Sequence, residues 1–199
     1  MDTTPGRREE NKARTRSALE QAAARLFEQH GFAATTVRDI AAAAGVGERT
    51  FFRYFPSKED LVLQQVRDLI PGLTDAIRAR PAAEPPLTAL CEAIVGWLEE
   101  TGTTPTILVS GPPKDSAWRK VEAHALQNDL EEAITRAFLD RLEAAGSDRE
   151  ASPTRLRAVI QARAGVAALR GLMYVHPGGG SGASDMARLI REAFAALES

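Results

Sequence analysis

The stretch that decides the fold runs from Thr35 to Asp60 and reads TTVRDIAAAAGVGERTFFRYFPSKED. Its first part has the i, i+3, i+4, i+7 spacing of apolar residues that marks one side of a helix. These residues are Val37, Ile40, Ala41 and Ala44. Thr36 is expected to cap this helix, with Asp39 three positions later as a variant of the capping box. The pattern therefore predicts a short helix that begins directly after Thr36.

A glycine turn separates this helix from a second one. Gly45 is expected to supply the positive φ of a tight helix exit, and Gly47 to open the next helix. The second helix holds the aromatic and basic run ERTFFRYF, in which Phe51 and Phe55 lie four residues apart and are expected to face the core. Helix, short glycine turn and helix is the helix-turn-helix arrangement, whose second helix enters the DNA major groove.

The motifs TVRDIAxxAGV, TFFRYF and PSKEDL, in this order, resemble the N-terminal signature of the tetracycline-repressor (TetR) family. The resemblance runs from about Lys12 to Leu61, the first third of the chain. The wording GERTFFRYFPSKED is also similar to actinobacterial members related to the mycofactocin regulator. The resemblance implies an all-α fold with a three-helix DNA-binding domain at 1–60, which a flexible arm at 1–11 precedes. A larger helical ligand-binding and dimerisation domain is expected at 61–199.

Individual roles at the DNA follow from the resemblance. It implies phosphate contacts for four residues: Thr36, Thr50, Tyr54 and Lys58. It assigns base reading to Gly47, Glu48 and Arg49, and contact with the DNA backbone to Phe52. Gly47 replaces the more usual capping serine, and Phe52 replaces a tyrosine, so two hydroxyl contacts are lost. The full set expected to contact DNA is Thr36, Arg38, Gly47, Glu48, Arg49, Thr50, Phe52, Arg53, Tyr54 and Lys58.

The residues themselves support part of this assignment. Arg49 and Arg53 lie four apart, on one side of the second helix, and an arginine can fork onto guanine O6 and N7 or onto phosphate. The alternative is that both arginines only solvate the helix surface. Net charge is −2, with residues 1–60 at +1 and the remainder at −3. This balance argues against sequence-blind coating of DNA and leaves room for a reader that uses a few placed contacts.

The rest of the chain predicts further helices. A connecting helix is expected from Ser57, which is predicted to cap it, with Asp60 three positions later. Pro71-Gly72 is expected to kink or end this helix, and Pro81 to Pro86 to form a linker. Further helices are predicted at 86–100, 118–145, 154–175 and 184–197, while residues 101–116 fit either a helical turn or a strand. The last two helices carry apolar residues on more than one side, as a two-fold four-helix dimer interface would. Ordinary packing within the chain is the alternative.

Composition and motifs limit the kinds of functional site that we expect in this chain. The chain has 199 residues, 44% of them hydrophobic and 26% charged, and one cysteine, Cys91, so we expect a globular cytoplasmic protein without an internal disulfide or membrane span. No catalytic residue, metal site or cofactor is expected, because no nucleophile elbow, dinucleotide fingerprint or histidine pair at metal spacing occurs.

Large side chains in the middle helices suggest a small-molecule effector. Those expected to line its cavity are Trp97, Trp118, Phe138 and Met173, the alternative being that they fill the core. We therefore expect a ligand-responsive, homodimeric regulator, a repressor of a palindromic operator that an apolar or aromatic effector releases. The rival is a helical enzyme, or a small-molecule or lipid carrier, with an accessory DNA-binding domain.

Overall fold

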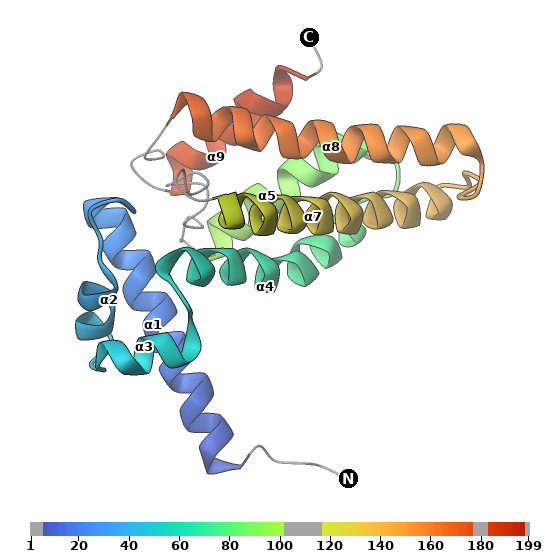
Figure 1. Cartoon of the computed structure of the whole chain (residues 1–199). Helices are drawn as coiled ribbons and strands as arrows, with labels where there is room; N and C mark the ends of the chain where they lie inside the picture. The colour runs from blue at the N-terminus through green and yellow to red at the C-terminus, as the bar shows by residue number, and fades with distance from the viewer. Residues whose placement is uncertain (1–5, 102–116, 177–182, 198–199) are drawn as a thin grey trace. The chain divides into compact units, whose positions relative to one another are not determined.

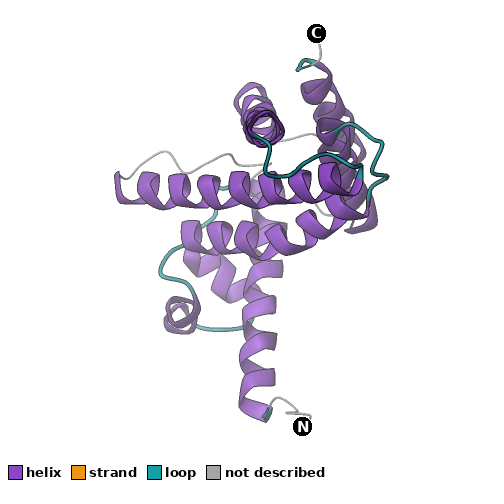
Figure 2. Cartoon of the chain, turned by 90° about the vertical axis from the view of Figure 1, so that its right-hand side faces the viewer, coloured by secondary structure: helices purple, strands orange, loops and turns teal. Residues whose placement is uncertain are grey.

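The computed structural model describes residues 6–101, 117–176 and 183–197 as an arrangement of helices (Figure 1). These are α1 (Arg7–His30), α2 (Val37–Ala43), α3 (Glu48–Tyr54), α4 (Lys58–Ala79), α5 (Pro86–Thr101), α7 (Ala117–Ala144), α8 (Ser152–Val175) and α9 (Ala183–Ala195). Within these ranges no residue forms a strand (Figure 2). The all-α fold predicted from the sequence is confirmed, while all but the first residue of the ambiguous stretch 101–116 lies outside the described residues.

The chain divides into two compact units, Met1–Gln65 and Val66–Ser199, and the division falls inside α4. The first unit packs α1, α2 and α3 around a small apolar core. The fully or almost fully buried side chains there are Leu19, Ala22, Ala23, Phe27, Ile40, Ala41, Phe51, Phe55 and Leu61. The predicted inward placement of Phe51 and Phe55 is therefore confirmed, with exposed fractions of 0% and 2%.

One predicted helix start is wrong. α1 begins at Arg7, so the expected flexible arm does not include residues 7–11, which are helical. Glu9 and Glu10 lie in the first turn, where negative charge offsets the helix dipole. α4 runs through Pro71, so of the two alternatives predicted there, a kink or a helix end, the end is excluded. A proline removes one helical N–H donor, but Pro71 and Arg67 are both exposed, so water can solvate the carbonyl that loses its partner.

The second unit has one continuous core. α7 packs along α8, and α5 packs against both α8 and α9. Fully buried residues at its centre are Leu90, Leu98, Ile134, Phe138, Ala162 and Ile190. Where α8 meets α5, a Cβ added to Gly165 on α8 would lie 2.5 Å from Cδ2 of Leu90 on α5. A small residue is therefore required there for the two helices to approach.

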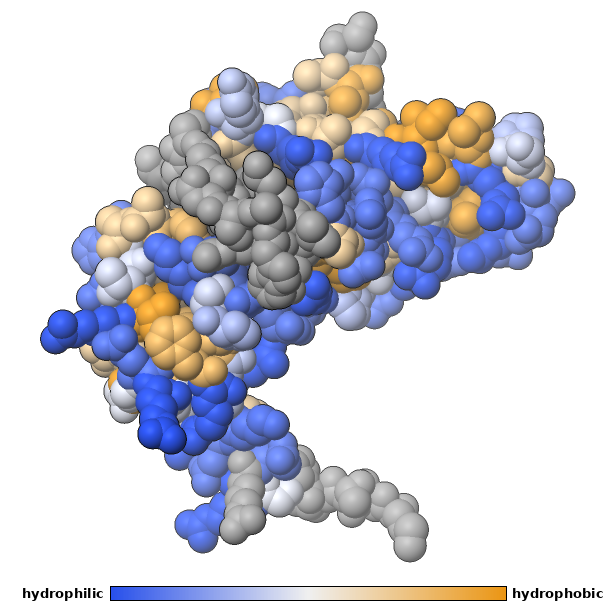
Figure 3. Space-filling model, in the orientation of Figure 1, coloured by the Kyte–Doolittle hydropathy of each residue, from blue (hydrophilic) through white to orange (hydrophobic). Residues whose placement is uncertain are grey.

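The two C-terminal helices use their apolar residues differently. On α9 the regular apolar stripe is buried within the chain, at Met186, Leu189, Ile190 and Phe194. α8 instead keeps large apolar side chains exposed: Leu156 is 60% and Ile160 56% exposed. A hydrophobic patch is visible over the N-terminal half of this helix (Figure 3). The intrachain alternative thus describes the stripe of α9, whereas α8 carries an apolar surface that the described part of the chain does not cover.

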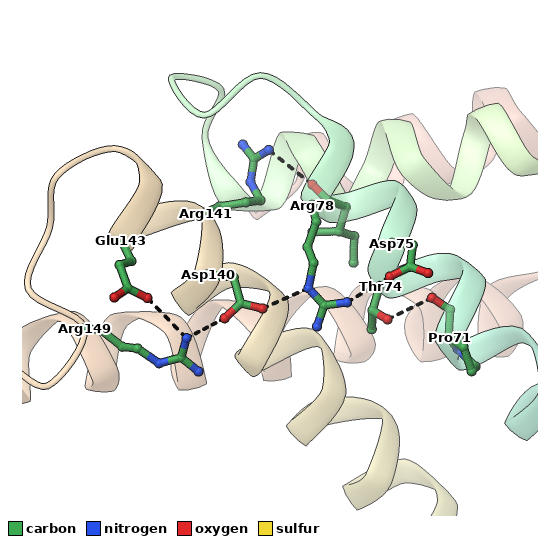
Figure 4. Close-up of polar contacts among 9 residues, drawn as sticks. Pro71, Thr74, Asp75, Arg78, Asp140, Arg141, Glu143 and Arg149 are labelled. Carbon is green, nitrogen blue, oxygen red and sulfur yellow. Dashed lines mark hydrogen bonds and ion pairs between the residues drawn. The ribbon is translucent and has the colours of Figure 1, made fainter.

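The end of α4 is fastened to α7 by charged side chains (Figure 4). Arg141 of α7 is only 4% exposed. Its guanidinium donates to the carbonyl oxygens of Ile77 at 3.2 Å, Arg80 at 2.6 Å, Pro81 at 2.8 Å and Glu84 at 2.7 Å. These bonds satisfy carbonyls at the C-terminal end of a helix and in the loop after it, which have no partner within the helix.

The neighbour of Arg141 on α7 adds an ion pair to the same end of α4. Asp140 accepts from Arg78 at 2.8 Å and from Arg149. Burial opposes ionisation of Asp140, but the bonds from the two arginines outweigh it, so the pKa of this carboxyl lies below its ordinary value. Two consecutive residues of α7 therefore hold the last turn of α4 and the loop that follows it.

Candidate nucleic-acid interface

The start of α2 is held by a complete capping box. The amide of Asp39 donates to the Thr36 hydroxyl at 3.1 Å, and the amide of Thr36 donates to the Asp39 carboxylate at 3.0 Å. The Thr36 hydroxyl itself donates to that carboxylate at 2.6 Å. These bonds lower the pKa of Asp39 below its ordinary value. The predicted cap is confirmed, and it directs the one hydroxyl proton of Thr36 into the cap.

The turn between α2 and α3 has the predicted glycine geometry. Gly45 has a φ of +70°, a conformation that glycine adopts at little cost and other residues rarely do. Gly47 stands at the N-cap of α3 with extended backbone and no side-chain hydrogen bond. Val46 is half-buried and its amide donates to the Ala41 carbonyl at 2.9 Å. The turn therefore fixes the direction of α3 relative to α2.

The outer side of α3 is polar, cationic and aromatic. Glu48, Arg49 and Arg53 are exposed, and Phe52 is 52% exposed. The Arg53 guanidinium lies 5.2 Å from the centre of the Tyr54 ring, a cation–π contact. The remaining predicted contact residues of α2 and α3 are Arg38, which is exposed, and Thr50 and Tyr54, which are half-buried. The structure thus brings the predicted residues together on one short, well-anchored pair of helices.

Lys58, in the first turn of α4, is held inside the first unit. Its ammonium donates to the carbonyl oxygens of Phe32 at 2.7 Å and Thr35 at 2.8 Å. It also lies 4.4 Å from the centre of the Phe32 ring. An ammonium has three N–H donors, so these bonds leave one. Lys58 therefore positions the loop that leads into the Thr36 cap, a role that sequence spacing did not show.

Thr35 is a second residue of this loop that the sequence did not single out. It is 2% exposed, and its hydroxyl lies 2.9 Å from the Gly31 carbonyl oxygen and 3.3 Å from that of Leu26. Buried polar groups of this kind are normally satisfied by such bonds. The only local sequence signal for this role of Thr35 was its position next to Thr36, which caps α2. Together Thr35 and Lys58 attach the loop to α1 and α4.

Replacing Lys58 with methionine is expected to lower the free energy of unfolding of the first unit by about 1–3 kcal/mol, because two carbonyls lose a charged donor. DNA affinity should fall alike for all sequences. Urea unfolding without DNA and DNA titrations at fixed salt provide the two measurements. Arg67→Met, an exposed change on α4, is the control. Weaker DNA binding at unchanged stability would assign Lys58 to phosphate contact alone.

The residues predicted to line an effector cavity lie in the second unit. Phe138 is fully buried in its core, and Trp97 and Met173 are half-buried and pack against that core. Trp118 lies in the first turn of α7, and its side chain is outside the described part of the chain. The placement brings Trp97, Phe138 and Met173 to one core.

Other chemistry is sparse in the described ranges. There, no three His, Cys, Asp or Glu side chains gather closely enough to hold a metal ion. Cys91 is a buried thiol on α5. Of the helices searched in the described ranges, none combines the length and the apolar character that crossing a membrane requires.

The helix-turn-helix region is similar in sequence to known proteins. A family model described as "Bacterial regulatory proteins, tetR family" matches residues 20–64. Among curated proteins, the HTH-type transcriptional regulator TcmR of Streptomyces glaucescens is 42% identical over 89 residues, which cover 45% of this chain and 39% of that protein. MftR of Mycobacterium tuberculosis, named for mycofactocin biosynthesis, is 36% identical over 78 residues, 36% of this chain and 39% of the relative. The chain thus spans about two-fifths of these relatives' lengths.

A solved structure extends the likeness to both units. The TetR-family repressor FadR of Thermus thermophilus, in complex with lauroyl-CoA, superposes with a TM-score of 0.57 at 24% sequence identity, covering 92% of this chain and 93% of that one. At this identity the likeness shows the fold. The chain therefore carries the N-terminal domain of the TetR family and has, over most of its length, the fold of TetR-family regulators.

Proposed function

We propose that this protein is a sequence-specific, DNA-binding transcription regulator that represses a palindromic operator as a homodimer. The observation that carries the proposal is the fixed α2–turn–α3 element, whose buried Phe51 anchors α3 while Glu48 and Arg49 stay exposed at its N-terminal end. A helix of this size fits the major groove, where its first residues reach base edges. The relatives named as transcription regulators support the same conclusion.

Roles at the DNA divide along α3. Arg49 is the base reader, because an exposed arginine in the first turn can donate two bonds to guanine. Arg53, one turn further on, and the Tyr54 hydroxyl contact phosphates, while Phe52 lies against the sugar–phosphate backbone. Thr50, Arg38 and Thr36 provide further phosphate contacts, for which the Thr36 hydroxyl must turn its proton from the Asp39 carboxylate toward the phosphate. Gly47 offers only its backbone, so specificity depends mainly on Glu48 and Arg49.

The homodimer forms through the two C-terminal helices, α8 and α9. Exposed apolar area on α8 supports this, since Leu156, Ile160, Tyr174 and Val175 are 56–87% exposed. Large apolar side chains gathered on one helix are typical of an interface and rare on monomers. α9, whose apolar stripe is already buried, contributes through its remaining surface. A two-fold axis through this bundle would give one reading head per half of a palindrome.

Leu156→Glu combined with Ile160→Glu is expected to turn the dimer into a monomer, because four carboxylates would be buried without partners in the interface. Affinity for a full operator should then fall by at least about 100-fold, since one head is lost. Sedimentation at micromolar concentration and DNA titration measure the two effects. Ala125→Glu, on an exposed position of α7, is the control. A wild-type protein that is monomeric at this concentration would contradict the dimer.

A small apolar or aromatic effector regulates the DNA affinity. The lauroyl-CoA complex of the Thermus thermophilus repressor supports an acyl ligand for proteins of this fold. In this chain, Trp97, Trp118, Phe138 and Met173 are the side chains we assign to the ligand. Release from DNA requires that the ligand bind one conformation of the dimer more tightly than the other. Mass analysis of small molecules that the native protein carries would identify the ligand class.

The rival function is a helical enzyme or carrier in which the DNA-binding domain is accessory. Selection from random double-stranded DNA by the intact protein separates the two. The regulator is expected to enrich an inverted repeat after a few rounds, because a specific site binds about 10³–10⁷ times more tightly than other DNA. Enrichment of no sequence, with a tightly bound small molecule in the same preparation, would favour the carrier.

A further inference from the structure

An unpaired carboxylate stands at the start of α3. Glu48 is the first residue of this helix, and its side chain is exposed. Within the described part of the chain it has no hydrogen-bond or ion-pair partner. A helical ion pair joins residues three or four positions apart, and these positions after Glu48 hold Phe51 and Phe52. The negative charge of Glu48 is therefore not neutralised along its own helix.

Glu48 lies on the same exposed side of α3 as the arginines. At about 100° per residue, Glu48 lies about 60° around the helix from the buried Phe51, and Arg49 about 160°. The exposed Phe52 and Arg53 fall at about 100° and about 200°, so the four exposed side chains occupy one continuous side. The first turn thus offers a carboxylate and a guanidinium to whatever α3 contacts.

A carboxylate in this place is selective about the base that it meets. It is repelled by every phosphate, and when ionised it accepts hydrogen bonds but donates none. In the major groove, guanine presents only acceptors, thymine an acceptor and a methyl group, and adenine an acceptor beside its amino group. Cytosine presents only the hydrogen of its N4 amino group. Among the four bases, cytosine is therefore the best partner for a carboxylate.

The alternative is that Glu48 only stabilises the start of α3. Negative charge in the first turn interacts favourably with the helix dipole, and Gly47 at the N-cap makes no side-chain hydrogen bond that would replace this effect. That role alone gives no dependence on the DNA sequence. Base preference and stability, measured on the same variant, therefore separate the two roles.

We propose that Glu48 accepts a hydrogen bond from the N4 amino group of one cytosine in each half-site, and that an operator with N4-methylcytosine at this position is not bound. This inference rests on the proposed function and adds a base and a form of regulation to it. In a pair with guanine, one N4 hydrogen is used by the pair and the other points into the major groove. A methyl group on N4 takes the place of the second hydrogen, so the carboxylate loses its donor and meets an apolar group.

The test begins with selection from random double-stranded DNA by the intact wild-type protein and by Glu48→Ala. The two enriched repeats should differ at one position in each half-site, where the wild type requires cytosine and the variant does not. N4-methylcytosine at this position should weaken wild-type binding at least about 10-fold and leave the variant unaffected. Glu48→Ala should also bind scrambled DNA more tightly at the same salt concentration, because a charge that phosphates repel is gone.

Two controls accompany this test. N4-methylcytosine placed outside the half-sites should leave wild-type affinity unchanged. Glu10→Gln removes an exposed carboxylate from the first turn of α1 and should keep the discrimination between methylated and unmethylated operators. Urea unfolding of Glu48→Ala without DNA measures the contribution of Glu48 to helix stability.

Enrichment of the same repeat by the wild type and by Glu48→Ala would overturn the inference and leave the proposed function intact. A loss of stability without a change in base preference would assign Glu48 to the helix dipole alone. A base other than cytosine at the position that depends on Glu48, or equal wild-type affinity for methylated and unmethylated operators, would also contradict the cytosine contact. Failure to enrich any DNA sequence would instead overturn the proposed function, and this inference with it.

Discussion

Replacing Arg49 with alanine is expected to weaken binding to the enriched operator by about 2–6 kcal/mol, because each of the two protomers loses a base contact worth about 1–3 kcal/mol. The side chain is exposed in the first turn of α3, so its removal leaves the fold intact. Binding to scrambled DNA should change little, and preference at the contacted base pair should relax. Titrations of both DNAs at one fixed salt concentration measure these effects.

Arg25→Ala is the matched control for this prediction. Arg25 is an exposed arginine of α1 in the same unit, so the variant loses the same charge away from α3. It should keep full discrimination between operator and scrambled DNA. If Arg49→Ala weakened both DNAs by the same factor, Arg49 would be a phosphate contact and base reading would have to come from another residue.

Replacing Arg141 with methionine is expected to lower the free energy of unfolding of the second unit by about 3–4 kcal/mol. Methionine keeps most of the buried volume but donates no hydrogen bond, so four carbonyl oxygens at the end of α4 lose their partner. Burial already lowers the pKa of Arg141, but the group starts so high that it stays charged at neutral pH. In the folded protein, the four carbonyl oxygens therefore take the place of the water that would solvate an exposed guanidinium.

Denaturant unfolding followed by tryptophan fluorescence measures this loss, because both tryptophans, Trp97 and Trp118, belong to the second unit. Protein concentration must be held constant, since the proposed dimer would contribute to apparent stability. Arg136→Met, an exposed change on α7, should change the free energy of unfolding by no more than about 0.5 kcal/mol. The loss of unfolding free energy in Arg141→Lys should lie between those in Arg141→Met and Arg136→Met, because a lysine ammonium has three N–H donors for the four carbonyls. Unchanged stability in Arg141→Met would mean that water replaces the guanidinium.

The helix-turn-helix could be predicted because its determinants are local. The spacing of apolar residues around Ile40, the Thr36–Asp39 cap and the positive φ of Gly45 all act within a few residues. Phe51 and Phe55 were identified as core residues for the same reason. Ser57 as the cap before α4 is also confirmed, since the Asp60 amide donates to its hydroxyl at 3.1 Å.

What could not be predicted depends on contacts between distant residues. Lys58 meets carbonyls 23 and 26 residues earlier, and Arg141 meets carbonyls 57–64 residues earlier. In the hydrophobic pattern of α7, Arg141 is only a polar residue between apolar neighbours. The stripe of α9 was visible, but whether it faces α5 and α8 or a second chain depends on tertiary packing. At Pro71 the sequence left a kink and a helix end open, because local propensity does not include the packing that keeps α4 continuous.

The central claim is that two copies of α3, held by a dimer, read an inverted repeat. Its most direct test measures the affinity of the intact protein for the enriched operator and for the same operator with about five or about ten base pairs inserted at its centre. Half-sites about 34–36 Å apart lie on one face of DNA, and five added base pairs turn one of them to the opposite face. We expect the insertion of about five base pairs to lower the affinity to that of a single half-site. Equal affinity for the operator, both insertions and an isolated half-site would contradict it.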